Sequence, residues 1–175
     1  AGGGHPTMMK AAVQAKTEGI CQPILLCNPD RLNRLAQRLK LDLSDIQSID
    51  RRADQEHGRR ATDAKHLAKE RARQGYNFEE AYDKMYERNY FGMMMVETGE
   101  ADAFITGLYT KYSNTIKVAK EVVGIRPDYN TFGTMHILNT KKGVYYIADT
   151  LINRHPDENV LVDIAKLSAQ TVRFF

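Results

Sequence analysis

Residues 88–107 have the sequence RNYFGMMMVETGEADAFITG, and this stretch decides the fold. Its first half predicts a helix over residues 89–98 that ends at Gly99, because a residue without Cβ suits the left-handed conformation that often closes a helix. Residues 103–106, Ala-Phe-Ile-Thr, are a short apolar run, which predicts a buried strand. The polar residues 109–115 and a new helical pattern follow. The order strand, polar loop, helix is typical of ligand sites in open α/β sheets.

The polar loop is a candidate anion site. It is rich in hydroxyl and amide side chains, and the helix that follows it offers unpaired backbone N–H groups at its start. Lys117 adds a positive charge in the first turn, and Thr106, Ser113 and Asn114 could donate hydrogen bonds. The alternative is a purely structural loop, in which Ser113 or Asn114 caps the helix.

The rest of the chain alternates helical and strand patterns, which predicts an α/β fold with a mostly parallel sheet flanked by helices. Before the central stretch we expect a helix over 7–19, a strand over 23–27, a helix over 31–39, a short strand near Ile46 and Ile49, an exposed polar connection over 51–62, a helix over 62–74 and a helix capped by Asn77. After it, residues 132–139 and 144–148 predict a β-hairpin, and an amphipathic helix follows His155. We expect residues 1–130 to form a first α/β lobe and residues 131–175 to begin a second lobe that is cut short.

The composition argues against several classes of protein. The 25 basic and 22 acidic residues give a net charge of +3, which is too small to indicate a nucleic-acid partner. No run approaches the roughly 20 apolar residues that a membrane-spanning helix needs. Two cysteines are too few for a disulfide framework, which indicates a reduced, cytoplasmic location. The five histidines lack the spacing of metal ligands, so we expect no metal site.

Two local patterns have simple structural interpretations. The arginines at 51–52 and 59–60 are surrounded by acidic residues, so we expect them on a solvated surface loop. The three methionines at 93–95 are expected to fill the core, because an unbranched thioether side chain adapts to irregular gaps.

The motif YFGxMMVxxGEADAxxxG, at residues 90–107, resembles the signature of the phosphate acetyl- and butyryltransferase family. The similarity covers almost the whole chain, from about residue 5 to residue 175. Residues 109–124 and 139–153 are more similar to the transferase-like domain at the C-terminus of bacterial NADP-dependent malic enzymes. The resemblance implies a binding cleft between two α/β lobes and assembly into homo-oligomers, with the hairpin as the candidate contact between subunits or lobes.

The resemblance also implies ligand residues. Arg71 falls at the family's first phosphate-binding arginine, and a planar guanidinium suits that role because it can hold two oxygens of an anion at once. Lys117 falls at the second arginine, and lysine keeps the charge but loses the two-pronged geometry. The expected site for acetyl phosphate or acetyl-CoA comprises Arg71, Thr106, Gly107, Ser113, Asn114 and Lys117. The family's catalytic serine, arginine and aspartate would lie beyond residue 175, so we expect no catalytic residue in this chain and no acyl transfer by the chain alone.

Three functions are open on these grounds. The first is a fragment of the regulatory, oligomerising domain of an NADP-dependent malic enzyme, whose separate N-terminal part would need NADP and a divalent metal to convert malate to pyruvate. The fragment itself would need no cofactor. The second is a phosphate acetyltransferase, which moves acetyl between coenzyme A and phosphate. The third is a structural oligomerisation domain that binds no ligand.

Overall fold

The computed structural model describes residues 4–108 and 110–174. Contacts divide the chain into two compact units, Ala1–Val123 and Gly124–Phe175. The expected boundary at residue 130, and the interpretation of residues 131–175 as part of a second lobe, stay predictions. Tyr109, which belongs to the predicted polar loop, lies outside the described residues.

The first unit begins with a helix and a βαβ arrangement. In chain order its first elements are α1 (Pro6–Thr17), β1 (Ile24–Leu26), α2 (Pro29–Leu39) and β2 (Gln47–Ile49). The two strands are parallel, and their register places Leu25 opposite Ser48. The side-chain oxygen of Asn28 accepts hydrogen bonds from the backbone nitrogens of Asp30 and Arg31 and so caps α2. The order helix, strand, helix, strand confirms the sequence prediction.

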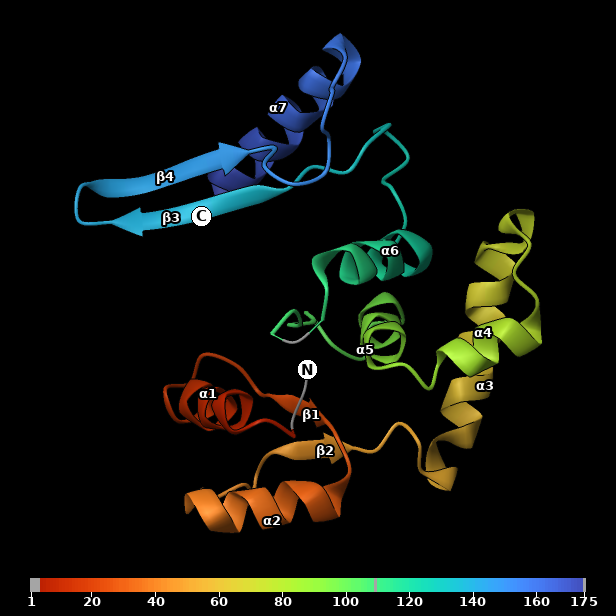
Figure 1. Ribbon diagram of the computed structural model, residues 1–175, viewed down its shortest axis with the longest axis vertical. Helices are drawn as coiled ribbons and strands as arrows, with labels where there is room; N and C mark the ends of the chain where they lie inside the picture. Colours follow the sequence, from red (N-terminus) through yellow and green to blue (C-terminus); the bar gives the residue numbers. More distant parts are fainter. Residues whose placement is uncertain (1–3, 109, 175) are drawn as a thin grey trace. The chain divides into compact units, whose positions relative to one another are not determined.

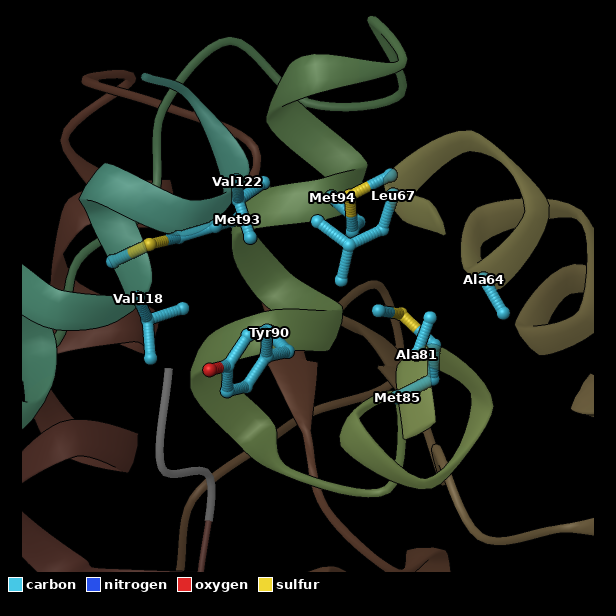
Figure 2. Packing of buried hydrophobic residues seen from close by; sticks show 9 residues of the cluster. All are labelled: Ala64, Leu67, Ala81, Met85, Tyr90, Met93, Met94, Val118 and Val122. Atoms are coloured by element: carbon cyan, nitrogen blue, oxygen red, sulfur yellow. The ribbon is translucent and has the colours of Figure 1, made fainter. Parts of the chain in front are cut away.

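Four further helices complete the first unit. They are α3 (His57–Glu70), α4 (Phe78–Lys84), α5 (Arg88–Glu97) and α6 (Tyr112–Val122), with short 3₁₀ turns at Asp54–Glu56 and Ala72–Gln74. Helix α5 ends just before Gly99, whose φ is +78°, as the sequence predicts. Figure 2 shows how side chains of the four helices meet in one buried cluster. Met93 and Met94 belong to this cluster, which confirms that the methionines fill the core.

Helices pack on both faces of the β1–β2 pair. Leu25 and Cys27 belong to a buried cluster with residues of α1 and α2. Leu26 and Ile49 belong to another cluster, which contains Phe91 of α5. In Figure 1, α2 and α5 lie on opposite sides of the two strands. This alternation follows from the pleat of a strand, which turns successive side chains to opposite faces.

The expectation of an exposed polar connection over residues 51–62 is wrong. Helix α3 begins at His57, and Arg60 in its first turn is only 2% exposed. The guanidinium Nη1 of Arg60 donates hydrogen bonds to the carbonyl oxygens of Arg51 and Ala53, at 2.7 and 2.9 Å. The charge pattern of the sequence could not reveal this burial, because the partners are backbone carbonyls and not acidic side chains.

The predicted strand over residues 103–106 is also absent from the described part of the chain. Instead, the ring of Phe104 packs on Gly92 of α5, where an added Cβ would lie 2.2 Å from the ring. The next residue, Ile105, is 71% exposed. The run therefore contributes one partly buried ring to the core, and a hydrophobic pattern alone does not distinguish such packing from strand pairing.

The second unit is a β-hairpin with one helix. Its elements are β3 (Met135–Thr140), β4 (Gly143–Ala148) and α7 (Glu158–Phe174). The strands pair antiparallel and α7 contacts β4, which confirms the predicted hairpin and final helix. The fold is α/β as expected. The expectation of a mostly parallel sheet is only partly right, because in the described residues the parallel part is a single pair of strands and the hairpin is a separate sheet.

Candidate functional site

A cavity of about 730 Å³ opens at the carboxyl ends of β1 and β2. This volume lies within the range of pockets that hold small molecules. Among the described residues, the charged and polar side chains that line it are His5, Asn28, Arg31, Asp50, Arg51, Arg52, Arg88, Thr106 and Thr110. Four arginines thus oppose one carboxylate. We call this space the arginine cavity, and its surplus of positive charge favours an anionic ligand.

Three helices begin at the arginine cavity. His5 precedes α1, Asn28 precedes α2 and Arg88 is the first residue of α5. Each helix start carries a partial positive charge, because its first N–H groups lack partners within the helix. The imidazole Nδ1 of His5 accepts a hydrogen bond from the backbone nitrogen of Thr7, and Asn28 caps α2. At α5, within the described residues, the residue before the helix, Glu87, makes no side-chain capping bond.

Arg88 occupies an electrostatically unfavourable position in the isolated domain. A helix dipole opposes a cation in the first turn, and the first turn of α5 contains no acidic residue. The Nε of Arg88 is shielded from solvent and has no hydrogen-bond partner among residues 4–108 and 110–174. A bound anion would satisfy both this nitrogen and the start of α5.

Asp50 organises the turn that follows β2. Its Oδ1 accepts a hydrogen bond from the backbone nitrogen of Arg52 at 3.1 Å, and its Oδ2 accepts one from Asn28 Nδ2 at 2.9 Å. The Nε of Arg51 donates to the carbonyl oxygen of Tyr86 at 2.8 Å. Burial, followed by the nearby positive charges of Arg52 and Arg88, lowers the pKa of Arg51 from its usual value. The cations therefore crowd one another, and an anion between them would relieve that repulsion.

Two of the predicted site residues, Thr106 and Gly107, line the arginine cavity. The hydroxyl of Thr106 donates a hydrogen bond to Oδ1 of Asn89, at 2.9 Å. Asn89 is 8% exposed on α5, so it fixes Thr106 from behind. Gly107 has φ +115°, a conformation that a residue with Cβ rarely adopts.

The other four predicted residues are not among the described residues that line this cavity. Arg71 donates hydrogen bonds to the carbonyl oxygens of Glu121 and Val122, at 2.7 and 3.3 Å, and so satisfies the C-terminal end of α6. Lys117 Nζ lies 3.8 Å from a carboxylate oxygen of Glu121. Ser113 and Asn114 lie in the first turn of α6. Ligand roles for these four residues stay predictions.

One local expectation about this helix is wrong. Neither Ser113 nor Asn114 is the capping residue, since α6 begins at Tyr112 and Lys111 precedes it without a side-chain capping bond among the described residues. A cap at Ser113 or Asn114 would have placed the start of the helix two or three residues later than it is.

The sequence interpretation missed the four arginines of the cavity. Arg31 and Arg88 are in the first turns of helices, and Arg51 and Arg52 directly follow a strand. These positions are the signal that could have identified them, because helix starts and carboxyl ends of parallel strands meet at the ligand edge of an α/β sheet. The interpretation instead treated 51–52 as part of a solvated loop, although both side chains line the cavity.

The chemistry of the remaining lining is that of a binding site without a metal-type ligand set. Burial, and then the negative charge of Asp50, raises the pKa of the Cys27 thiol, so the thiol stays protonated at neutral pH. In the described part of the chain, there is no group of three or more His, Cys, Asp or Glu side chains that could hold a metal ion. None of the helices there has both the length and the apolar character needed to cross a membrane.

The fold and the cavity together define an α/β domain with a cationic pocket at the carboxyl ends of its parallel strands. The family of phosphate acetyl/butaryl transferases matches residues 1–175, and the chain belongs to this family. The NADP-dependent malic enzyme of Escherichia coli (strain K12) is 30% identical over 177 aligned residues, which cover 99% of this chain and 23% of the relative. The phosphate acetyltransferase of Thermoanaerobacterium thermosaccharolyticum is also 30% identical, over 98% of this chain and 52% of the relative.

A solved structure agrees with these relatives. The EutD phosphotransacetylase from Staphylococcus aureus has a TM-score of 0.82 and 26% identity, over 98% of this chain and 51% of that protein. The chain thus spans about a quarter of the malic enzyme and about half of each transferase.

Proposed function

We propose that this domain binds acetyl phosphate or acetyl-CoA at the arginine cavity, as the regulatory and oligomerising domain of an NADP-dependent malic enzyme. Oxidative decarboxylation of malate to pyruvate would belong to a separate part of that enzyme, which would use NADP and a divalent metal. The domain alone would not transfer acyl groups. A cytoplasmic location is part of the proposal.

The arginine cavity is the observation that carries the proposal. Guanidinium groups suit phosphate because their planar donors match two oxygens at once and their charge persists at any physiological pH. A phosphate monoester carries about two negative charges at neutral pH, enough to offset part of the repulsion among Arg51, Arg52 and Arg88. Apolar residues in the lining, such as Met8 and Ile105, offer a surface for the uncharged part of an acetylated ligand.

The malic-enzyme role is supported by identity over nearly the whole chain and by one residue. Lys117 stands where the family's second phosphate-binding arginine is expected, and it is paired with Glu121. A catalytic transferase would be expected to keep the two-pronged guanidinium at that position. A phosphate acetyltransferase is the second candidate function, and the equal identity to the Thermoanaerobacterium enzyme supports it.

The first experiment separates these two functions. Acetyl-CoA and acetyl phosphate are titrated into the full-length protein that contains this domain. Malate-dependent NADPH formation and acetyl transfer to phosphate are assayed side by side in the same samples. Malate turnover that changes with either compound, without acetyl transfer, is the expected result. Acetyl transfer without malate turnover would contradict the proposal and support the second candidate.

The second experiment tests the cavity. Arg31 and Arg38 lie at opposite ends of α2, and both are exposed, but only Arg31 lines the cavity. Arg31→Met should weaken the binding of acetyl-CoA to the 175-residue chain, and Arg38→Met should not. Equal affinities for the two variants would show that the ligand binds elsewhere.

A further inference from the structure

We propose that Arg60 is a positioning residue, which holds Arg51 and Arg52 in place to bind the ligand. Arg60 does not line the arginine cavity itself. The inference rests on the proposed function, because it concerns the same cavity.

The contacts of Arg60 surround the backbone of Arg52. Nη1 of Arg60 donates to the carbonyl oxygen of Arg51 at 2.7 Å and to that of Ala53 at 2.9 Å. These two carbonyls flank Arg52 on either side. One buried guanidinium nitrogen therefore fixes the peptide groups before and after a cavity residue.

A second set of contacts links Arg60 to Arg51 through Tyr86. The guanidinium carbon of Arg60 lies 4.6 Å from the centre of the Tyr86 ring, a cation–π distance. The carbonyl oxygen of Tyr86 accepts a hydrogen bond from Nε of Arg51, at 2.8 Å. Arg51 is thus held through its carbonyl by Arg60 and through its side chain by Tyr86, and the orientation of its guanidinium depends on both.

The position of Arg60 is not one that stability alone favours. A charge that is 2% exposed needs to recover its lost hydration, and a well-packed apolar side chain of similar size often serves as well or better. Nε of Arg60 has no hydrogen-bond partner among the described residues. What this buried cation does provide is two hydrogen bonds to the turn that carries two cavity arginines, and these fix the geometry of that turn.

Loss of Arg60 should leave the contacts of Asp50 with the turn in place but release the carbonyls of Arg51 and Ala53. Arg51 and Arg52 would then sample more orientations, and ordering them would be left to the ligand. We expect acetyl-CoA to bind at least about tenfold more weakly, the scale of one lost hydrogen bond to a charged group.

The test is isothermal titration calorimetry with the 175-residue chain, well below its unfolding temperature. Acetyl-CoA and acetyl phosphate are titrated in parallel experiments. Arg60→Met removes the donors and keeps most of the volume, and Arg60→Lys restores the charge and an ammonium group that can donate. Leu67→Ala is the control, because Leu67 is 1% exposed on the same helix and belongs to the core cluster, away from the cavity. We expect Arg60→Met to weaken binding, Arg60→Lys to recover part of the loss, and Leu67→Ala to lower the unfolding temperature with Kd unchanged.

Each outcome decides the inference. A folded Arg60→Met chain with the wild-type Kd would overturn it, and so would a Leu67→Ala chain that loses as much affinity as Arg60→Met. If Arg60→Met does not fold, Tyr86→Leu replaces it, since this change removes the ring but keeps the carbonyl, and wild-type affinity there would also overturn the inference. Two outcomes would instead overturn the proposed function and this inference with it. In the first, the wild-type chain binds neither compound. In the second, the Arg31→Met variant binds both compounds as tightly as the wild type does.

Discussion

Gly92→Ala tests the packing that the structure shows in place of the predicted strand. An added Cβ at residue 92 would lie 2.2, 2.6 and 2.7 Å from three ring atoms of Phe104. Real Cβ atoms do not approach that closely, so the ring must leave its position. Phe104 contacts two of the buried clusters, which leaves little room for a small adjustment.

The magnitude follows from two opposing effects. Alanine in a helix interior is about 1 kcal/mol more favourable than glycine. Displacing the side chain of Phe104, which is partly buried, costs up to the roughly 1.5–3 kcal/mol of a fully buried phenylalanine. We therefore expect the free energy of unfolding to fall by about 0.5–2 kcal/mol. Because Thr106 follows two residues after Phe104, the affinity for acetyl-CoA should also fall.

The assay is urea unfolding followed by far-UV circular dichroism, with the slopes of the transitions compared as well as their midpoints. Gly58→Ala is the matched control, since Gly58 is in α3 and an added Cβ there meets no described atom within 4 Å. It should leave stability unchanged or raise it by up to about 1 kcal/mol. If Gly92→Ala gains stability as this control does, the packing of Phe104 on α5 is refuted.

Three further predictions concern carboxyl groups whose pKa the fold shifts. Burial raises the pKa of Asp63, which is 2% exposed, to about 6. The neutral carboxyl therefore stabilises the folded state, and this contribution is lost as the pH rises through 6. In urea unfolding, the free energy of unfolding of Asp63→Asn should exceed that of the wild type by about 2 kcal/mol at pH 8 and equal it near pH 4. Burial opposes the ionisation of Glu121, but hydrogen bonds from Tyr76 and Tyr90 outweigh it and lower the pKa of Glu121; Glu121→Gln should therefore cost about 1–3 kcal/mol at pH 7, and an equal stability of the two proteins there would contradict this bonding. For Asp149, hydrogen bonds outweigh burial and lower the pKa to about 2, so its contribution is present above about pH 4 and lost as the pH falls toward 2; Asp149→Asn should destabilise the hairpin unit by about 1 kcal/mol at pH 7 and not at pH 2, as amide exchange in β3 and β4 would show.

The parts of the fold that the sequence predicted correctly depend on nearby residues. Asn28 and Asn77 cap their helices because the acceptor and its donors are two or three residues apart. Gly75 and Gly99 close helices with positive φ, again through local geometry. The hairpin was predictable for the same reason, since its two strands are joined by a tight turn.

The parts that failed depend on distant partners. Within residues 103–106, the ring of Phe104 packs on Gly92 of a helix and not on a neighbouring strand. The sequence shows that these residues are apolar, but it does not show which surface they contact. Arg60 is buried because the carbonyls of residues 51 and 53 and the rings of Tyr82 and Tyr86 surround it. The acidic residues near Arg60 in the sequence predicted an exposed side chain. That reasoning considers charged neighbours only, and the partners of Arg60 are backbone carbonyl oxygens.

Two of the six predicted site residues line the arginine cavity, and their role in binding stays a prediction. Thr106 and Gly107 were identified because Thr106 ends the apolar run and Gly107 opens the loop after it, and the structure places both at the arginine cavity. The four arginines were missed because they come from three separate segments that only the fold brings together. The family resemblance led to Arg71 instead, and in this structure its guanidinium bonds to the end of α6.

His5, Asn28 and Arg88 come from distant parts of the sequence, so the arginine cavity exists only after α1, α2 and α5 have all packed on the strand pair. A partly folded first unit that lacks any one of these helices lacks the complete binding site. Ligand binding therefore favours the fully assembled unit over every partly opened form at once. Helix α1 forms one wall of the cavity, so in the bound domain it should open only after the ligand has dissociated.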